Sequence, residues 1–239
     1  MNLFSASVGV ILAVGIASLS PTPMGAQSGI VNTTLAEAQL PGMPAAPVNV
    51  RVSEWVSNSG ATGFTHSHGS GWVYVVRGAH ILTMGGRTET FLPGQAVWTP
   101  VGVVHTHDWD RTQAHVFWFI GTATNQPPTV PPPPAAQTGG VLFRFMGLTA
   151  PLEGLLTGSY TVRLSRITLQ PGGQTGVVRV TQPQVLIGVT GTMGIVTATG
   201  GRVLPADEVM LMQAGSAYML RNQSAAPAAV LVQALVRQE

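Results

Sequence analysis

The sequence contains no cysteine and no lysine among its 239 residues. Without a thiol there can be no disulfide bond, thiolate metal ligand or cysteine nucleophile, and without lysine there can be no Schiff-base amine. Charged residues make up only 8%, and the basic residues are all arginines without a cluster. The high isoelectric point therefore reflects few acids, and we expect no nucleic-acid partner. Any chemistry must come from histidine, carboxylates, hydroxyls or a bound metal.

The composition favours an all-β protein. Apolar residues make up 45% of the chain, and they are accompanied by 29 Gly and 18 Pro. Many short buried strands joined by tight turns would produce this mixture. The length is sufficient for one large or two small domains.

The N-terminus has the pattern of an export signal. The apolar run at residues 8–17 has the length of a secretory hydrophobic region, about 7 to 15 residues, whereas a membrane-spanning helix needs about 20. We interpret residues 1–26 as a signal peptide cleaved near Ala26 and residues 27–47 as an N-terminal extension. This predicts a periplasmic or extracellular protein without a membrane span in its mature form. An uncleaved anchor and a wrongly assigned start codon are the alternatives.

The rest of the chain contains a duplication. Residues 122–140 are rich in proline, which donates no backbone hydrogen bond, so this segment is interpreted as a linker. A shift of 113 residues aligns five positions before the linker with five after it: Gly63 with Gly176, Gly78 with Gly191, Gly94 with Asp207, Gly102 with Gly215 and His105 with Tyr218. We therefore predict two similar domains, at residues 48–121 and 141–236.

All six histidines lie in the first domain, between residues 66 and 115. His66 and His68 are two residues apart, as are His105 and His107, and side chains two apart on a strand share a face. In the second repeat the counterpart of His107 is the apolar Leu220, which suggests that this face is the domain interior. Imidazole is the commonest metal ligand in proteins, so the pattern points to a metal site.

Two segments around these histidines resemble the two sequence motifs of the cupins. Residues 63–78, GFTHSHGSGWVYVVRG, resemble G-x5-H-x-H-x3-4-E-x6-G, and residues 94–105, GQAVWTPVGVVH, resemble the start of G-x5-P-x-G-x2-H-x3-N. The resemblance implies two tandem cupin-type double-stranded β-helix (jelly-roll) barrels. It also implies that His66, His68 and His105 bind a divalent transition metal, with Fe, Mn, Ni, Cu and Zn all open.

One departure from the cupin pattern changes the expected site. The acidic ligand of the first motif would fall at Gly71 or nearby, and residues 69–72 contain no carboxylate. The resemblance therefore implies a three-histidine site, as in thiol dioxygenases of the cupin family. In the second copy the ligand positions hold residues that do not form a normal transition-metal site, so that domain is expected to be metal-free: Arg179, Thr181, Gln184 and Tyr218.

The sequence leaves the role of His107 open. It is our candidate catalytic acid or base, and a fourth ligand or a hydrogen-bond donor to a ligand are the alternatives. His80 and His115 are interpreted as ordinary strand residues. Five aromatic residues are expected to pack in the core, with a substrate cavity as the alternative: Trp72, Tyr74, Trp98, Phe117 and Phe119.

Two functions fit these features. The first is a dioxygenase-like oxidoreductase that acts on a small organic substrate at the metal. The second is a non-catalytic module that binds a small molecule or a metal. Histidines that merely line a polar pocket are the alternative to a metal site, and metal-independent isomerase chemistry ranks last because no aspartate is well placed. The sequence leaves homo-oligomer formation open.

Overall fold

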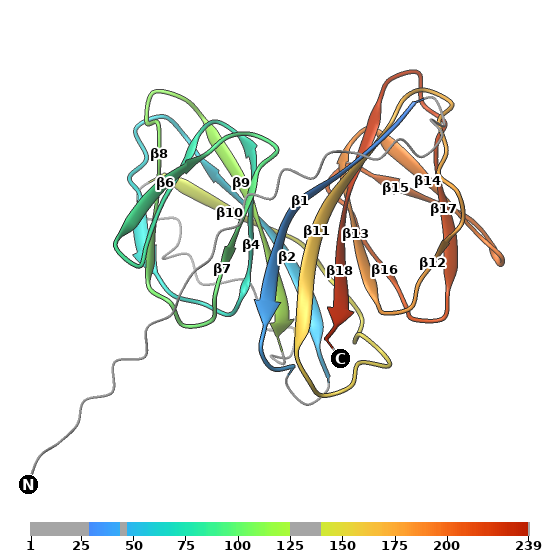
Figure 1. Cartoon of the computed structure of the whole chain (residues 1–239). Coiled ribbons are helices and arrows are strands. Elements are labelled where there is room, and N and C mark those ends of the chain that lie inside the picture. Colours follow the sequence, from blue (N-terminus) through green and yellow to red (C-terminus); the bar gives the residue numbers. More distant parts are fainter. Residues whose placement is uncertain (1–28, 44–46, 125–139, 239) are drawn as a thin grey trace, which may run out of the picture.

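The computed structural model describes residues 29–43, 47–124 and 140–238, and in these ranges the chain forms strands and no helix. The predicted signal peptide and residues 125–139 of the predicted linker lie outside the described residues. The strands form four antiparallel sheets, which pair into two barrels side by side (Figure 1). The all-β, two-barrel expectation is therefore confirmed. None of the described residues belongs to a helix that could cross a membrane.

The N-terminal barrel consists of a five-stranded and a four-stranded sheet, in the orders β10-β2-β9-β4-β7 and β3-β8-β5-β6. Its strands are β2 (Asn49–Ser57), β3 (Phe64–His66), β4 (Gly71–Arg77), β5 (His80–Met84), β6 (Arg87–Phe91), β7 (Ala96–Thr99), β8 (His105–Trp109), β9 (His115–Thr124) and β10 (Val141–Leu148).

The C-terminal barrel has the same arrangement, with the sheet orders β1-β11-β18-β13-β16 and β12-β17-β14-β15. Its strands are β1 (Ile30–Leu40), β11 (Tyr160–Leu169), β12 (Val178–Arg179), β13 (Gln184–Thr190), β14 (Thr192–Thr197), β15 (Gly200–Pro205), β16 (Val209–Met212), β17 (Ala217–Asn222) and β18 (Ala228–Arg237).

The structure follows the repeat found in the sequence. Three strand pairs, β4 with β13, β7 with β16 and β9 with β18, have bounds that differ by 113 residues at both ends. The turn chemistry also agrees, because Gly94 has a φ of 87° and its counterpart Asp207, the one non-glycine residue with positive φ among those described, has a φ of 67°. Aspartate tolerates this left-handed conformation better than most residues, so the turn survives the loss of glycine.

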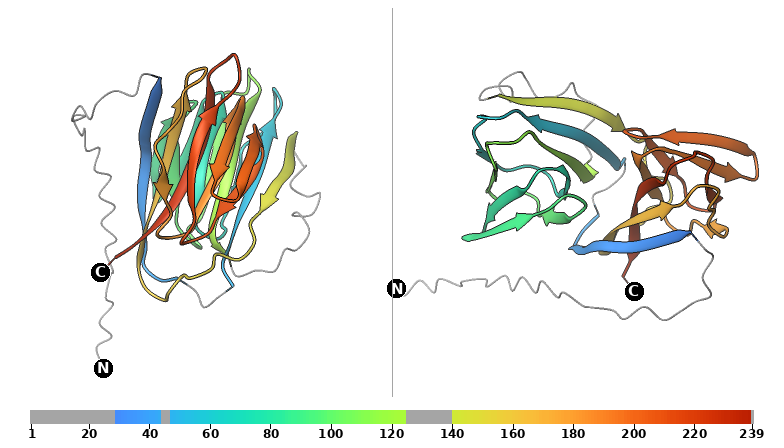
Figure 2. Two further views of the ribbon diagram at one scale, coloured as in Figure 1. Left: turned by 90° about the vertical axis from the view of Figure 1, so that its right-hand side faces the viewer. Right: turned by 90° about the horizontal axis from the view of Figure 1, so that it is seen from above.

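The two barrels exchange their first strands. β1 pairs with β11 in the C-terminal barrel, and its repeat equivalent β10 pairs with β2 in the N-terminal barrel. In Figure 2 these two strands run along opposite sides of the pair of barrels. The sequence predicted a separate extension at residues 27–47 and a C-terminal barrel that starts at residue 141. In the structure, β1 of that extension belongs to the C-terminal barrel, and β10, which starts at residue 141, belongs to the N-terminal barrel.

A shared apolar core lies between the two five-stranded sheets. Trp72 and Tyr74 of β4 and Trp118 of β9 belong to the same buried cluster as Leu164 of β11 and Ile187 of β13. Since side chains alternate along a strand, the opposite face of β9 points into the N-terminal barrel. Both faces of this strand are therefore buried, which explains its continuous apolar sequence VFWFI.

Candidate metal centre

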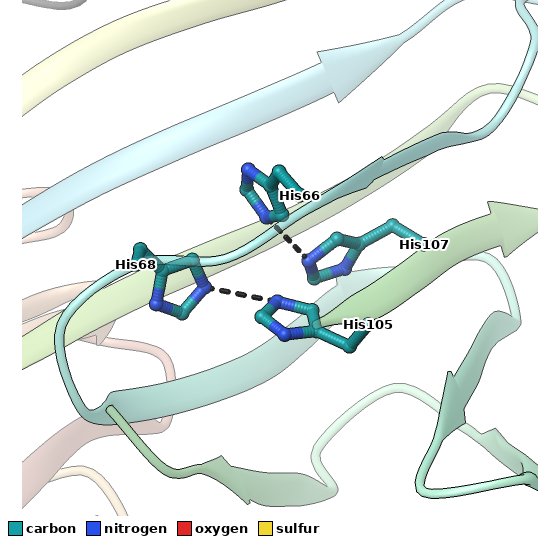
Figure 3. Close-up of side chains that lie close together, drawn as sticks. All are labelled: His66, His68, His105 and His107. Atoms are coloured by element: carbon teal, nitrogen blue, oxygen red, sulfur yellow. Dashed lines mark hydrogen bonds between the residues drawn. The ribbon is translucent and has the colours of Figure 1, made fainter. Parts of the chain in front are cut away.

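Four histidines converge inside the N-terminal barrel, as Figure 3 shows. One ring nitrogen of each lies within 4.8 Å of those of the others, and we call His66, His68, His105 and His107 the histidine cluster. The Nε2 atoms of His68 and His105 are 3.0 Å apart, and those of His66 and His107 are 3.1 Å apart. The structure thus brings together all four imidazoles that the sequence spacing placed on one face.

Strand pairing explains how the cluster forms. His66 lies opposite His105 where β3 pairs with β8, and Phe64 lies opposite His107. β3 ends at His66, yet the following loop holds His68 in place because the Gly102 amide donates to the His68 carbonyl at 2.9 Å. On β8 His105 and His107 are buried while Thr106 and Asp108 are partly exposed, as the alternation of strand side chains requires.

Backbone contacts determine which nitrogen of His68 and His105 carries the proton. The Nδ1 atom of His105 lies 2.8 Å from the Val103 carbonyl, and that of His68 contacts the Gly69 carbonyl. A carbonyl oxygen can only accept, so each Nδ1 carries the hydrogen and each neutral ring leaves Nε2 as a bare acceptor. Two acceptors therefore face each other at 3.0 Å. A cation between them would relieve their repulsion.

The surroundings of the cluster oppose protonation. Burial, together with the neighbouring His68 and His105, lowers the pKa of His66 to about 4. Burial also lowers the pKa of His68 and of His105, and lowers that of His107 well below its usual value. The four rings are therefore neutral near pH 7, which is the protonation state that binds metal.

The missing acidic ligand has a steric explanation. A Cβ atom at Gly71 would lie 2.6 Å from the Phe119 ring and 2.7 Å from the Ile120 carbonyl, so no side chain fits there. The Phe119 ring in turn packs against His68, with centroids 4.2 Å apart. Glu54 is occupied elsewhere, since its carboxylate accepts from Trp118 Nε1 and pairs with Arg144. The cluster is therefore built from imidazoles alone.

Of the five aromatic residues, three pack in the apolar core and two lie beside the histidine cluster. Trp72, Tyr74 and the partly buried Trp98 pack in the core between the barrels, as expected. Phe117 and Phe119 instead face the histidines. The Phe117 ring is stacked on His107 with centroids 5.2 Å apart and an interplanar angle of 8°, and it is also stacked on Trp55.

Sequence reasoning missed two residues next to the cluster. His80 and His115, interpreted as ordinary strand residues, are fully buried and hydrogen-bond to one another at 3.1 Å, and His80 also contacts His107 at 2.9 Å. The repeat contained a usable signal, because their counterparts at 193 and 228 are the apolar Met193 and Ala228. Both counterparts are buried in the C-terminal barrel, which indicates inward-facing positions.

The equivalent positions of the C-terminal barrel are arranged differently. The Tyr218 hydroxyl donates to Gln184 Oε1 at 2.9 Å, while Arg179 and Thr181 are exposed. The interior of this barrel is filled by an apolar cluster that includes Met193, Ile195 and Leu220. The residues at the four ligand positions of this barrel, Arg179, Thr181, Gln184 and Tyr218, therefore do not converge as the histidines do.

The histidine cluster fits a transition metal. Imidazole suits Zn, Cu, Fe and Ni. Nitrogens bound to one tetrahedral zinc ion at ~2.0–2.1 Å are ~3.4 Å apart. Two pairs of the ring nitrogens are already 3.0 and 3.1 Å apart and all four lie within 4.8 Å, so shifts of about an ångström or less would let them bind one ion. The carbonyl contacts at His68 and His105 are the kind of outer hydrogen bond that fixes a ligating histidine.

Comparison with known proteins gives a clear result at the level of structure. No family model matches the sequence, and no curated protein matches it significantly. AerE from Microcystis aeruginosa has a TM-score of 0.56 at 13% identity, covering 86% of this chain and 99% of that one. An oxalate decarboxylase has a TM-score of 0.56 at 12% identity, with 80% and 71% covered. A "cupin 2 conserved barrel domain protein" from Leptotrichia buccalis has a TM-score of 0.44 at 9% identity, with 90% and 92% covered.

These identities are too low to transfer an activity, but the arrangement of strands is shared along most of the chain. The resemblance first carried by the two histidine-containing motifs is thus matched by the fold of both halves. The chain therefore has the double-stranded β-helix fold that the cupin resemblance implied, present in two copies that have exchanged their first strands.

Proposed function

We propose that the protein binds one divalent transition-metal ion in its N-terminal barrel through the Nε2 atoms of His66, His68, His105 and His107. The observation that carries this proposal is the pair of acceptor nitrogens on His68 and His105, which face each other at 3.0 Å while both Nδ1 atoms contact backbone carbonyls. Without a cation this arrangement costs electrostatic energy, and with one it supplies two correctly oriented ligands.

The proposed ligand set is larger than the three histidines implied by the cupin motifs. His107 takes the place of the missing carboxylate, since its Nε2 atom lies 3.1 Å from that of His66 and no side chain fits at Gly71. This assigns His107 to the metal instead of to acid–base catalysis. The set is neutral, so a divalent ion keeps its full charge and is a stronger Lewis acid than beside a carboxylate.

The test is a titration of the metal-free, tag-free protein with Co²⁺ and Zn²⁺. We expect one ion per chain in the wild type and none bound at comparable affinity in a His68→Ala, His105→Ala variant. Thr106→Val is the matched control, because Thr106 lies on β8 between two proposed ligands but bonds to Thr65 on the opposite face. Equal binding by wild type and double variant would refute the proposal.

A second candidate function, dioxygenase-like oxidation of a small organic substrate, is favoured by the uneven exposure of the site. His66 and His68 are partly exposed whereas His105 and His107 are buried, so the cluster is reached from the side of β3 and the loop after it. A redox-active metal there would polarise a chelating substrate and exchange electrons with oxygen. Phe119, packed on His68, would contact an apolar part of that substrate.

Oxygen consumption by Fe²⁺-loaded protein with panels of small chelating acids and thiols tests this second candidate. The His68→Ala, His105→Ala variant should show none. If every panel leaves oxygen consumption at the level of free Fe²⁺, the binding function stands alone and the catalytic candidate fails.

We also propose that the protein is exported, on the basis of the apolar run at residues 8–17. Export would place the metal site in a compartment outside the cytoplasm. The mass of the protein recovered from its native host tests this directly: a mature chain beginning near Gln27 is expected, and a full-length cytoplasmic chain would overturn the proposal.

A further inference from the structure

A chain of hydrogen bonds leads from the histidine cluster to the far side of the N-terminal barrel. His107 Nδ1 lies 2.9 Å from His80 Nε2, and His80 Nδ1 lies 3.1 Å from His115 Nε2. His115 Nδ1 then lies 3.3 Å from the Ser57 hydroxyl. All four residues are at most 2% exposed. We call Ser57, His115, His80 and His107 the imidazole chain.

The direction of this chain is set at Ser57. Its hydroxyl oxygen lies 3.3 Å from the His115 carbonyl, which can only accept, and we assign the single hydroxyl proton to this contact. With this assignment the same oxygen accepts from His115 Nδ1. His115 is therefore protonated on Nδ1 and presents a bare Nε2 to His80.

The same reasoning passes along the chain. His80 donates from Nδ1 to His115 and presents a bare Nε2, which accepts from His107 Nδ1. His107 is thereby left with an unprotonated Nε2, the atom directed at the centre of the histidine cluster. If every donor and acceptor in this series of hydrogen bonds were exchanged, His107 Nε2 would carry a proton and could not bind a metal.

We propose that Ser57, His115 and His80 are positioning residues that fix the tautomer and ring orientation of His107, so that His107 serves as the fourth metal ligand. This inference rests on the proposed metal-binding function and deepens it. Metal-ligating histidines usually donate their second nitrogen to a carboxylate, a carbonyl or water. Here two further neutral imidazoles and a serine take that place.

The packing around the chain supports a positioning role. Phe117 is stacked on His107 at an interplanar angle of 8°, and Trp109 is stacked on His115 at 6°. A neutral imidazole has one donor and one acceptor, which is what each link requires.

Nitrogen NMR of the full chain tests the tautomers without any metal. Long-range ¹H–¹⁵N correlation spectra of ¹⁵N-histidine-labelled, metal-free protein contain signals from only six histidines. We expect His107, His80 and His115 all to carry the proton on Nδ1. A proton on His107 Nε2 would overturn the inference, whether or not the protein binds metal.

Metal affinity of single variants provides the second test. Removing an outer partner of a ligand typically costs about 10–100-fold in affinity. We expect a Zn²⁺ affinity loss of this size in His80→Phe, measured by competition with a chelating dye, and an altered visible spectrum of the Co²⁺ form. His80→Gln, which keeps an acceptor for His107 Nδ1, should recover part of the affinity. Ser57→Ala should lower it with the smallest structural change.

Thr99→Val is the matched control. Thr99 is fully buried in the same barrel, and its hydroxyl donates to the Gly71 carbonyl at 3.0 Å and not to an imidazole. It should retain the affinity and Co²⁺ spectrum of the wild type. If wild type binds Zn²⁺ and both Ser57→Ala and His80→Phe bind it equally well, the positioning role is wrong although the metal site stands. If the wild type binds no metal, the proposed function fails. The NMR measurement of the histidine tautomers then tests by itself whether Ser57, His115 and His80 fix the tautomer of His107.

Discussion

The imidazoles of His68 and His105 meet Nε2 to Nε2 at 3.0 Å, and both donate from Nδ1 to a backbone carbonyl. We expect this relationship in a metal site and not among histidines that merely line a polar pocket. In such a pocket one ring would donate to the other. Here each ring donates its Nδ1 proton to a backbone carbonyl, so neither has a proton to donate to the other. Burial also lowers the pKa of both rings, which disfavours an additional proton between the two Nε2 atoms.

The affinity of the site should follow the order for nitrogen ligands, with Cu²⁺ above Zn²⁺ and Ni²⁺, then Co²⁺, and Mn²⁺ weakest. Mg²⁺ and Ca²⁺ should not compete, because they prefer oxygen ligands and the cluster contains none. Competition against a Zn²⁺-sensitive dye measures the series. Displacement of Zn²⁺ by millimolar Mg²⁺ would show that carboxylates, not these imidazoles, hold the ion.

Replacing Gly63 by alanine should damage the site, whereas Gly69→Ala should not. A Cβ atom at Gly63 would lie 2.4 Å from the His107 carbonyl, so β3 must shift away from β8 and separate His66 from His105. At Gly69 a Cβ atom meets nothing within 4 Å. We expect Gly63→Ala to cost about 1–3 kcal/mol in unfolding free energy and to weaken Zn²⁺ binding. Similar urea midpoints and affinities for both variants would contradict this.

Phe117 should contribute strongly to stability. It is 2% exposed and stacked between His107 and Trp55, so Phe117→Ala should cost about 3–5 kcal/mol. Phe145, which is 44% exposed and lies near the Arg51 guanidinium, is the control, and its alanine variant should cost about 1 kcal/mol or less. Denaturant unfolding of the metal-free proteins measures both losses, and equal losses would mean that the stack carries little energy.

The metal-free protein should lose stability as the pH falls from about 6.5 toward about 4. Burial lowers the pKa of His115 from 6.5 to about 4 on folding, so between these values the unfolded chain binds the additional proton. The free energy of unfolding therefore decreases as the pH is lowered through this window. His66 acts in the same direction. Urea midpoints at pH 7, 5.5 and 4.5 measure the effect, and His115→Phe should reduce the slope.

Much of the fold could be predicted from the sequence because turn glycines and strand spacing are local features. The shift of 113 residues predicted the equivalence of Gly94 and Asp207, and both adopt positive φ. The exchange of β1 and β10 could not be predicted, because the 113-residue repeat was aligned only from Gly63 onward. Which barrel a first strand joins depends on long-range pairing, which local sequence does not encode.

The candidate site was predicted in part for a similar reason. Alternation along a strand placed His105 and His107 on one face, and the structure buries both. It could not show that Phe119 fills the space beside Gly71, since these residues lie on different strands of one sheet. Nor could it show that His80 approaches His107, because that contact depends on the register between β5 and β8.

A crystal structure of the Co²⁺-loaded protein, with anomalous scattering measured at the cobalt edge, tests the central claim most directly. We predict a single strong peak within bonding distance of the Nε2 atoms of His66, His68, His105 and His107. A peak bound by other residues, or an empty cluster in crystals grown with excess Co²⁺ and neutral buffer, would contradict the four-histidine metal site.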